Sequence, residues 1–254
     1  MRTVLTILSV WFATIVLAPI VIVARLLGVE KGEHGVAQWC MRMWARSMLV
    51  AAGAKVVVHH PERILRGRGA VYACNHVSWF DVFAIASVLP RYTFIAKSEL
   101  RKLPIFGWGA ESAGVVFLTR DNRKSAFESY KGAAEEVTSG KNVVVFPEGT
   151  RGREYALRPF KKGPFVLAIA AQAPVVPVLV YGAREVMSKG SFRVRPSTVH
   201  VHFLEAVESK GLGYEQRHVL MRAVWERIAT CLRTEYGVTT SEHPIAEPVS
   251  ELPA

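Results

Sequence analysis

The longest apolar stretch of the chain lies at its N-terminus. No charged residue occurs from position 4 to position 24, and roughly 20 apolar residues suffice for a helix to cross the hydrocarbon core of a bilayer. A signal peptide would have a shorter apolar region followed by a small-x-small cleavage site, whereas this stretch ends in Arg25-Leu26-Leu27-Gly28. The pattern therefore favours a membrane-associated helix over a cleaved signal or a helix of a soluble core.

A second helical segment covers residues 35–52. It mixes apolar positions with Trp39 and Trp44 and with Arg42 and Arg46. Tryptophan and arginine suit the headgroup region of a membrane, but the same pattern also fits a helix packed on the core of a domain. We therefore assign residues 1–52 to N-terminal membrane-associated helices. A spanning first helix and a two-helix anchor in one leaflet both remain open.

From Lys55 onward, apolar runs typical of strands alternate with helical patterns. This alternation predicts an α/β domain over residues 53–236, with a mixed, mostly parallel sheet flanked by helices. The polar tail from 237 to 254 contains prolines and is expected to be disordered. The expected strands are 55–59, 70–74, 92–96, 114–119, 142–146, 175–181, 192–195 and 199–203, and the expected helices are 82–88, 123–138, 163–171 and 214–236.

Composition narrows the choice of partners. The chain has 254 residues, a net charge of +11 and 50% apolar residues, which suits one sizeable domain that binds polyanions such as anionic lipid, phosphorylated substrates or nucleic acid. Three widely separated cysteines without a C-x-x-C pair indicate a reducing compartment, without a disulfide framework or a metal-ligand cluster. No base-reading motif accompanies the charge, so nucleic acid is not an expected partner.

The first motif with chemical content is Asn75-His76-Val77-Ser78-Trp79-Phe80-Asp81. It follows an apolar strand and precedes a helix. If His76 lies in the turn and Asp81 in the first helical turn, the carboxylate can accept a bond from one imidazole nitrogen and leave the other nitrogen as a base. Ser78 and Asp81 also fit a helix capping box, and Ser78 is a weak candidate nucleophile because no G-x-S-x-G elbow surrounds it.

The second motif is Phe146-Pro147-Glu148-Gly149-Thr150-Arg151, which follows the buried strand at 142–146. Loops at the ends of strands bind ligands in α/β sheets. Gly149 would allow the backbone to approach a ligand closely, and Arg151 could hold a phosphate with two parallel hydrogen bonds.

Together, Asn-His-x-x-x-x-Asp and Phe-Pro-Glu-Gly-Thr-Arg resemble the motifs of the glycerolipid acyltransferase family, and most nearly those of its members that acylate lysophosphatidic acid. Gly152 departs from the family, which often has serine there. The resemblance covers residues 70–182. Weaker family blocks occur in the same order at Lys97-Ser98-Glu99-Leu100, Gly114-x-x-Phe117-x-x-Arg120, Phe160-Lys161-Lys162-Gly163 and Val175-Val176-Pro177-Val178.

The resemblance implies an enzyme that moves an acyl group from acyl-CoA or acyl carrier protein to the sn-2 hydroxyl of lysophosphatidic acid, which gives phosphatidic acid for phospholipid biosynthesis. It implies no cofactor beyond the thioester co-substrate and no metal. The excess of lysine and arginine in the domain predicts an active site on the cytoplasmic face of the inner membrane. His76 would be the general base and Asp81 its partner.

By the same resemblance, the substrate-binding residues would follow the two motifs and their neighbouring blocks. Glu148 would bind an acceptor hydroxyl or brace an arginine, whereas Arg158 is expected to be a solvated surface charge. The substrate-binding set expected from the resemblance is Lys97, Arg120, Glu148, Gly149, Thr150 and Arg151, in which the three cations hold phosphate.

Two other functions fit parts of the sequence. A sister enzyme with the same motifs could acylate glycerol-3-phosphate, a lyso-ornithine lipid or another lysolipid. An inactive membrane-bound lipid-binding protein would also retain the fold, but intact His76, Asp81 and Arg151 argue against it.

Overall fold

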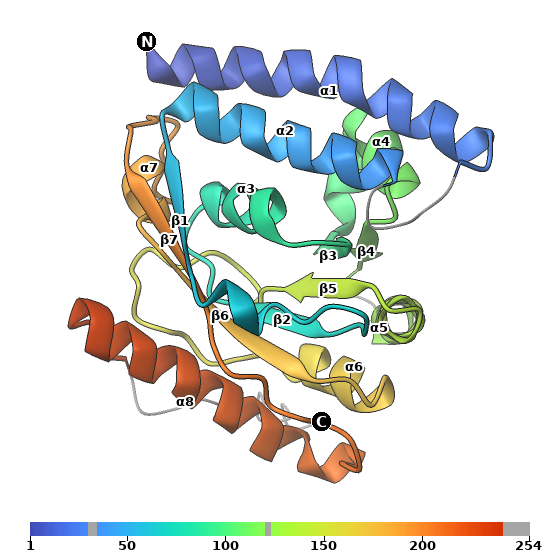
Figure 1. Cartoon of the computed structure of the whole chain (residues 1–254), viewed down its shortest axis with the longest axis vertical. Helices are drawn as coiled ribbons and strands as arrows, with labels where there is room; N and C mark the ends of the chain where they lie inside the picture. Colours follow the sequence, from blue (N-terminus) through green and yellow to red (C-terminus); the bar gives the residue numbers. More distant parts are fainter. Residues whose placement is uncertain (30–34, 120–122, 241–254) are drawn as a thin grey trace, which may run out of the picture.

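A single twisted sheet forms the centre of the molecule. The computed structural model describes residues 1–29, 35–119 and 123–240, and within them seven strands pair in the order β1-β7-β6-β2-β5-β3-β4 (Figure 1). All neighbouring pairs are parallel except β6 and β7, which are antiparallel. The strands are β1 (Lys55–His59), β2 (Val71–Cys74), β3 (Tyr92–Lys97), β4 (Val116–Leu118), β5 (Asn142–Val145), β6 (Val175–Tyr181) and β7 (Thr198–Phe203).

Helices cover both faces of this sheet. Figure 1 shows α1, α2, α3 and α4 above it, α6 and α8 below it, and α5 at its right-hand end. Helix α5 packs in the same hydrophobic core as α6 and α8. The helices are α1 (Arg2–Leu26), α2 (Val36–Ala52), α3 (Trp79–Val88), α4 (Phe106–Ser112), α5 (Arg123–Thr138), α6 (Gly163–Ala170), α7 (Ala183–Val186) and α8 (Arg217–Tyr236), and short 3₁₀ helices lie at η1 (Pro61–Arg63), η2 (Ser98–Lys102) and η3 (Tyr214–Gln216).

The central strand β2 separates two hydrophobic cores. Its successive side chains point to opposite faces of the sheet. Tyr72 and Cys74 are buried with residues of α2 and α3, whereas Val71 and Ala73 are buried with residues of α5, α6 and α8. A central parallel strand covered on both sides must be apolar at every position, which explains why its sequence lacks the alternation of a surface strand.

Helix α1 packs along the domain and contacts α2 and α4. Near its start, the Val194 N–H donates to Thr3 Oγ1 at 3.0 Å. Near its end, the Arg25 guanidinium donates to the Glu111 carbonyl at 3.1 Å, and the absence of a side chain at Gly109 lets α4 approach Ala18 closely. Both ends of α1 are therefore attached to the domain.

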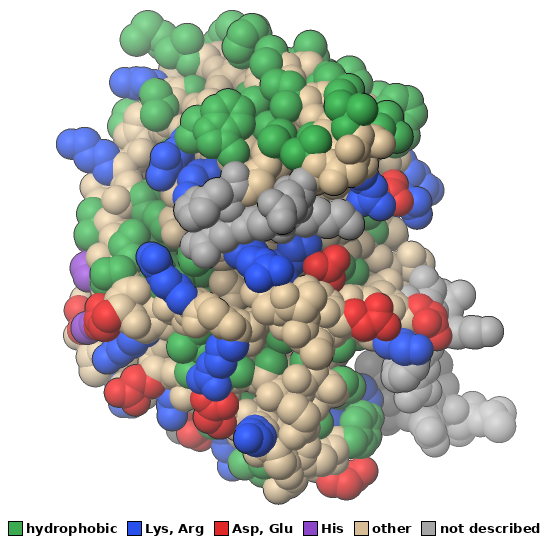
Figure 2. Space-filling view, turned by 45° about the vertical axis from the view of Figure 1, so that its right-hand side comes forward, with side chains coloured by type: hydrophobic (Ala, Val, Ile, Leu, Met, Phe, Trp, Pro, Cys, Tyr) green, Lys and Arg blue, Asp and Glu red, His purple; other side chains and the backbone are tan. Residues whose placement is uncertain are grey.

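The outward face of α1 is apolar. Figure 2 shows hydrophobic side chains gathered at the top of the molecule, above a belt that contains blue Lys and Arg side chains. Among the described residues, α1 is the one helix long and apolar enough to cross a membrane, and 17% of its most apolar window is buried in the protein. The exposed large apolar residues of α1 are Val4, Leu5, Ile7, Leu8, Trp11, Phe12, Ile15, Val16, Ile20, Val23 and Leu26.

The expected mixed, mostly parallel sheet with flanking helices is confirmed. The expected strand at 192–195 is wrong: this segment is irregular. Its backbone donors contact groups outside the sheet, since the Val194 N–H reaches Thr3 and the Arg195 N–H donates to the Val186 carbonyl at 3.0 Å. The division at residue 52 stays a prediction, and residues 241–254 of the expected disordered tail lie outside the described part of the chain.

Candidate active site

The two motif loops meet because β2 and β5 are adjacent parallel strands. Ala73 pairs with Val145 in the register of these strands, and His76 and Glu148 each follow three residues later. The carboxyl ends of parallel strands lie at the same edge of a sheet, where α/β proteins bind ligands. The Gly152 N–H donates to the His76 carbonyl at 2.7 Å, which joins the loops directly.

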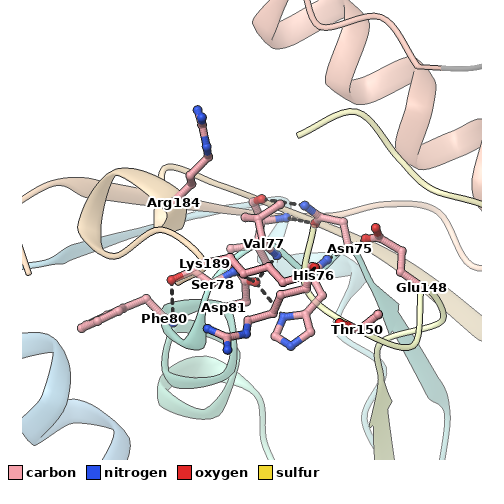
Figure 3. A network of polar contacts seen from close by, with 12 residues as sticks. Asn75, His76, Val77, Ser78, Phe80, Asp81, Glu148, Thr150, Arg184 and Lys189 are labelled. Atoms are coloured by element: carbon pink, nitrogen blue, oxygen red, sulfur yellow. Dashed lines mark hydrogen bonds and ion pairs between the residues drawn. The ribbon is translucent and has the colours of Figure 1, made fainter. Parts of the chain in front are cut away.

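His76 and Asp81 contact each other at the start of α3. His76 Nδ1 lies 2.9 Å from Asp81 Oδ2 (Figure 3). An ionised carboxylate only accepts hydrogen bonds, so Nδ1 carries the proton and Nε2 of the neutral ring is left with a free lone pair. The imidazole also stacks on Phe146 at 4.1 Å between ring centroids. The aromatic ring and the carboxylate together fix the orientation of the histidine.

The same carboxylate also caps α3. Asp81 Oδ2 accepts from the Val77 N–H at 2.7 Å and from the Ser78 N–H at 2.8 Å. Ser78 Oγ accepts from the Phe80 N–H at 3.1 Å, which completes the other half of the cap. The same oxygen of Asp81 therefore both caps α3 and orients His76.

The position of Ser78 excludes it as a nucleophile. The residue is fully buried, and its hydroxyl donates to the Met187 carbonyl at 2.6 Å. A hydroxyl used by the helix cap on one side and by this carbonyl on the other is not available to a substrate.

Glu148 connects the two motif loops from inside the protein. Its Oε1 accepts from the His76 backbone N–H at 2.8 Å, and its Oε2 accepts from Arg158 Nε at 3.1 Å. Arg158 also donates to the Thr150 carbonyl. Burial raises the pKa of the Glu148 carboxyl, and the bonds from His76 and Arg158 oppose that rise. Of the two expected roles of Glu148, these contacts favour the bracing one.

Arg158 was expected to be a solvated surface charge, and the structure shows that expectation to be wrong. Its side chain is 36% exposed and forms an ion pair with a carboxylate that is 2% exposed. Sequence reasoning missed it because it lies ten residues after Glu148, with no periodic pattern between them. An isolated buried glutamate in a loop was the available signal, since such a group requires a partner.

The three cations expected to hold phosphate differ in their surroundings. The Arg151 guanidinium lies over the Trp79 ring, 5.0 Å from its centroid. Burial lowers the pKa of Arg151, and the charge of Asp81 opposes this. Lys97 is exposed at the end of β3 and forms an ion pair with Glu99 at 2.6 Å. Arg120 lies outside the described residues.

Asn75 closes the site on the side of β6. Its side-chain amide donates to the Val180 carbonyl at 3.0 Å and its side-chain oxygen accepts from the Val180 N–H at 2.7 Å. The side chain thereby continues the pairing of β2 with β6 by one step and holds the residue before His76 in place.

In the second motif, Gly149 adopts a φ of 78°, a conformation that favours glycine.

Comparison with protein families identifies this arrangement. The family model described as Acyltransferase matches residues 55–181, half of the chain. The chain belongs to the acyltransferase family. Both motif loops of this acyltransferase, and the strands that carry them, lie within the matched region.

Individual relatives agree with that assignment. A putative 1-acyl-sn-glycerol-3-phosphate acyltransferase of Caenorhabditis elegans is 34% identical over 73% of this chain and 64% of its own length. A 1-acyl-sn-glycerol-3-phosphate acyltransferase of Neisseria gonorrhoeae is 37% identical over 52% of this chain and 51% of its own length. The matches span from about a third to just under two thirds of the curated relatives' length.

A solved structure covers nearly the whole acyltransferase. The crystal structure of the 1-acyl-sn-glycerophosphate acyltransferase PlsC from Thermotoga maritima matches 95% of this chain and 100% of that chain. The TM-score is 0.72 and the sequence identity is 26%. The likeness includes the N-terminal helices, because 95% coverage leaves few residues unmatched.

Burial of Glu148 makes stability depend on pH, and the ion pair with Arg158 opposes this dependence. Burial raises the pKa of Glu148 above its ordinary 4.5, so the folded state binds a proton on this carboxyl more tightly than the unfolded chain does. The free energy of unfolding therefore falls as the pH rises from 4.5 through the raised pKa of the folded state. Replacing Arg158 with Leu removes a group that opposes the shift, so we expect a loss of about 1–2 kcal/mol at neutral pH and less near pH 5.

Urea unfolding in detergent at pH 5 and pH 8 measures this effect. Arg153→Leu is the matched control, because Arg153 lies exposed on the same loop. An Arg158→Leu variant whose loss is the same at both pH values, or no larger than that of the control, would contradict the ion-pair account.

Proposed function

We propose that this acyltransferase transfers a fatty acyl group from an acyl thioester to the sn-2 hydroxyl of lysophosphatidic acid and forms phosphatidic acid. The observation that carries the proposal is the contact of His76 Nδ1 with the buried Asp81 carboxylate, which leaves Nε2 as a base. The relatives named 1-acyl-sn-glycerol-3-phosphate acyltransferases support the choice of acceptor.

The chemistry requires one well-oriented base. An alcohol is a poor nucleophile at neutral pH, and His76 Nε2 removes its proton as the oxygen attacks the thioester carbonyl. Asp81 stabilises the imidazolium that forms. Collapse of the tetrahedral intermediate expels a thiolate, which leaves readily without a strong acid, and the proton on His76 can then pass to the thiolate. No covalent acyl-enzyme is needed.

Phosphate recognition falls to cations near His76. Arg151 belongs to the loop whose Gly152 N–H contacts the His76 carbonyl, so its guanidinium can hold a phosphate close to the base. Lys97 and Arg120 are proposed as further phosphate ligands on the resemblance alone. The donor is acyl-CoA or acyl carrier protein, and the reaction uses no cofactor or metal.

We further infer that α1 lies in one leaflet of the membrane, with its apolar face toward the hydrocarbon core of the bilayer. A spanning helix needs its two ends on opposite sides of the bilayer, whereas Thr3 and Arg25 at the two ends of α1 both contact the catalytic domain. Apolar residues on one face and arginines at the edge are typical of an interfacial helix.

The catalytic domain is proposed to face the cytoplasm. The net charge of the chain, +11, attracts the protein to anionic lipids, which are concentrated in the cytoplasmic leaflet. Its cysteines are free thiols, which suits a reducing compartment.

Replacing His76 with Ala tests the proposed function. Loss of a general base should lower turnover of lysophosphatidic acid by about 10²–10⁴-fold. The measurement is the initial rate of acyl transfer from acyl-CoA to lysophosphatidic acid in detergent micelles, with circular dichroism as the check of folding. His60→Ala is the control, since His60 is exposed and its ring contacts the side chain of Glu62, away from the two motif loops. A folded His76→Ala protein with near-normal turnover would refute the mechanism.

Charge on the outward face of α1 should weaken membrane binding. Trp11 and Phe12 are 64% and 73% exposed, so Trp11→Glu and Phe12→Glu leave the core intact but require a carboxylate to enter the apolar part of the leaflet, at a cost of about 2–3 kcal/mol at full depth. We expect each variant to bind liposomes at least about tenfold more weakly in sedimentation assays. The control for the change from an apolar to a charged residue is Val219→Glu. Val219 is 68% exposed on α8, which lies on the side of the molecule opposite α1. Equal binding by all three variants would contradict a bilayer contact through α1.

A further inference from the structure

The loop after α7 returns to the active site. Residues 188–191 form a tight turn in which the Ser191 N–H donates to the Ser188 carbonyl at 3.1 Å. Gly190, with a φ of 85°, occupies the corner that requires a left-handed residue, and Lys189 occupies the other corner. The loop is held at its base by the bond from Ser78 Oγ to the Met187 carbonyl. The position of Lys189 is therefore tied to the N-cap of α3.

A single peptide group connects Lys189 to the proposed base. The Gly152 N–H donates to the His76 carbonyl at 2.7 Å, and the Arg151 carbonyl of the same peptide accepts from Lys189 Nζ at 2.7 Å. Adding the C=O and C–N bond lengths gives an upper limit of about 8 Å between Lys189 Nζ and the His76 carbonyl oxygen. Figure 3 shows Lys189 beside the turn that carries His76 and Asp81.

Neither Lys189 nor Arg151 forms an ion pair with a carboxylate among the described residues, although the charge of Asp81 acts on Arg151. Two other cations near the motifs do form ion pairs, Lys97 with Glu99 and Arg158 with Glu148. The contacts of Lys189 and Arg151 are instead a carbonyl oxygen and the ring of Trp79. Two N–H groups of the Lys189 ammonium are free to bind an anion.

We propose that Lys189 and Arg151 form a phosphate-binding subsite beside His76, in which Lys189 is a substrate-binding residue. Lys189 lies beyond the region matched by the family model, which ends at residue 181. The inference rests on the proposed acyl transfer and adds a cation that the resemblance did not supply. The ligand chemistry is a phosphate ester, carried either by the lysophosphatidic acid acceptor, in which it is separated from the reacting hydroxyl by a few bonds, or by the CoA portion of the donor.

Steady-state kinetics of Lys189→Gln test the subsite. Loss of one exposed charge-assisted hydrogen bond should raise KM for the phosphate-bearing substrate about tenfold and leave kcat within about twofold of the wild type. Lys189→Arg should retain most of the affinity, because it keeps the charge. The matched control is Arg193→Gln, which removes an exposed charge from the same loop without touching the site and so corrects for attraction of anionic substrates to the whole protein.

The assay varies three substrates: lysophosphatidic acid, monoacylglycerol as a neutral acceptor, and acyl-CoA. A rise in KM for lysophosphatidic acid but not for monoacylglycerol supports a subsite for the acceptor phosphate, and a rise only for acyl-CoA supports one for the donor phosphate. Equal loss of kcat with both acceptors would overturn the proposal and make Lys189 a brace of the Arg151 loop, as would kinetics identical to those of Arg193→Gln. A wild type that acylates neither acceptor would refute the proposed function instead.

Discussion

One oxygen of a buried carboxylate organises the site. Asp81 Oδ2 accepts hydrogen bonds from the His76 imidazole and from the N–H groups of Val77 and Ser78. The bonds from Val77 and Ser78 hold the turn that begins α3, and the bond from the imidazole sets the ring orientation and the tautomer of His76. Because a buried carboxylate is costly without donors, any structure that keeps α3 capped in this way also keeps His76 poised as a base.

The second motif loop depends on this turn and reinforces it. Glu148 accepts from the His76 N–H, and the Gly152 N–H donates to the His76 carbonyl, so both backbone groups of the histidine are bonded to the loop after β5. Arg158 and Lys189 hold that loop through its carboxylate and a carbonyl. Catalysis requires reacting groups positioned to within a fraction of an ångström, and these crossed backbone contacts supply such rigidity without using the His76 side chain.

Local patterns predicted much of the fold, and non-local contacts account for what they missed. The strands 55–59 and 175–181 and the helix 123–138 were predicted to the residue because hydrophobic periodicity is a local property. His76 and Asp81 are five residues apart, so their contact follows from one turn. Arg158 contacts Glu148 across 10 residues of irregular chain, and Lys189 contacts Arg151 across 38 residues, so no local pattern predicts either contact. Helix α4 was missed because Gly107 and Gly109 weaken its helical pattern while allowing close approach to neighbouring backbone.

The central claim is that Asp81 fixes the tautomer of His76 so that Nε2 is free to remove a proton. Nitrogen-15 NMR of histidine-labelled protein in detergent micelles, at a pH at which imidazole side chains are neutral, tests it directly, with the resonance assigned by comparison with His76→Ala. The account predicts a proton on Nδ1 and an unprotonated Nε2, and a redistribution between the two nitrogens in Asp81→Asn. A resonance pattern with the proton on Nε2 of the wild-type enzyme would contradict the account.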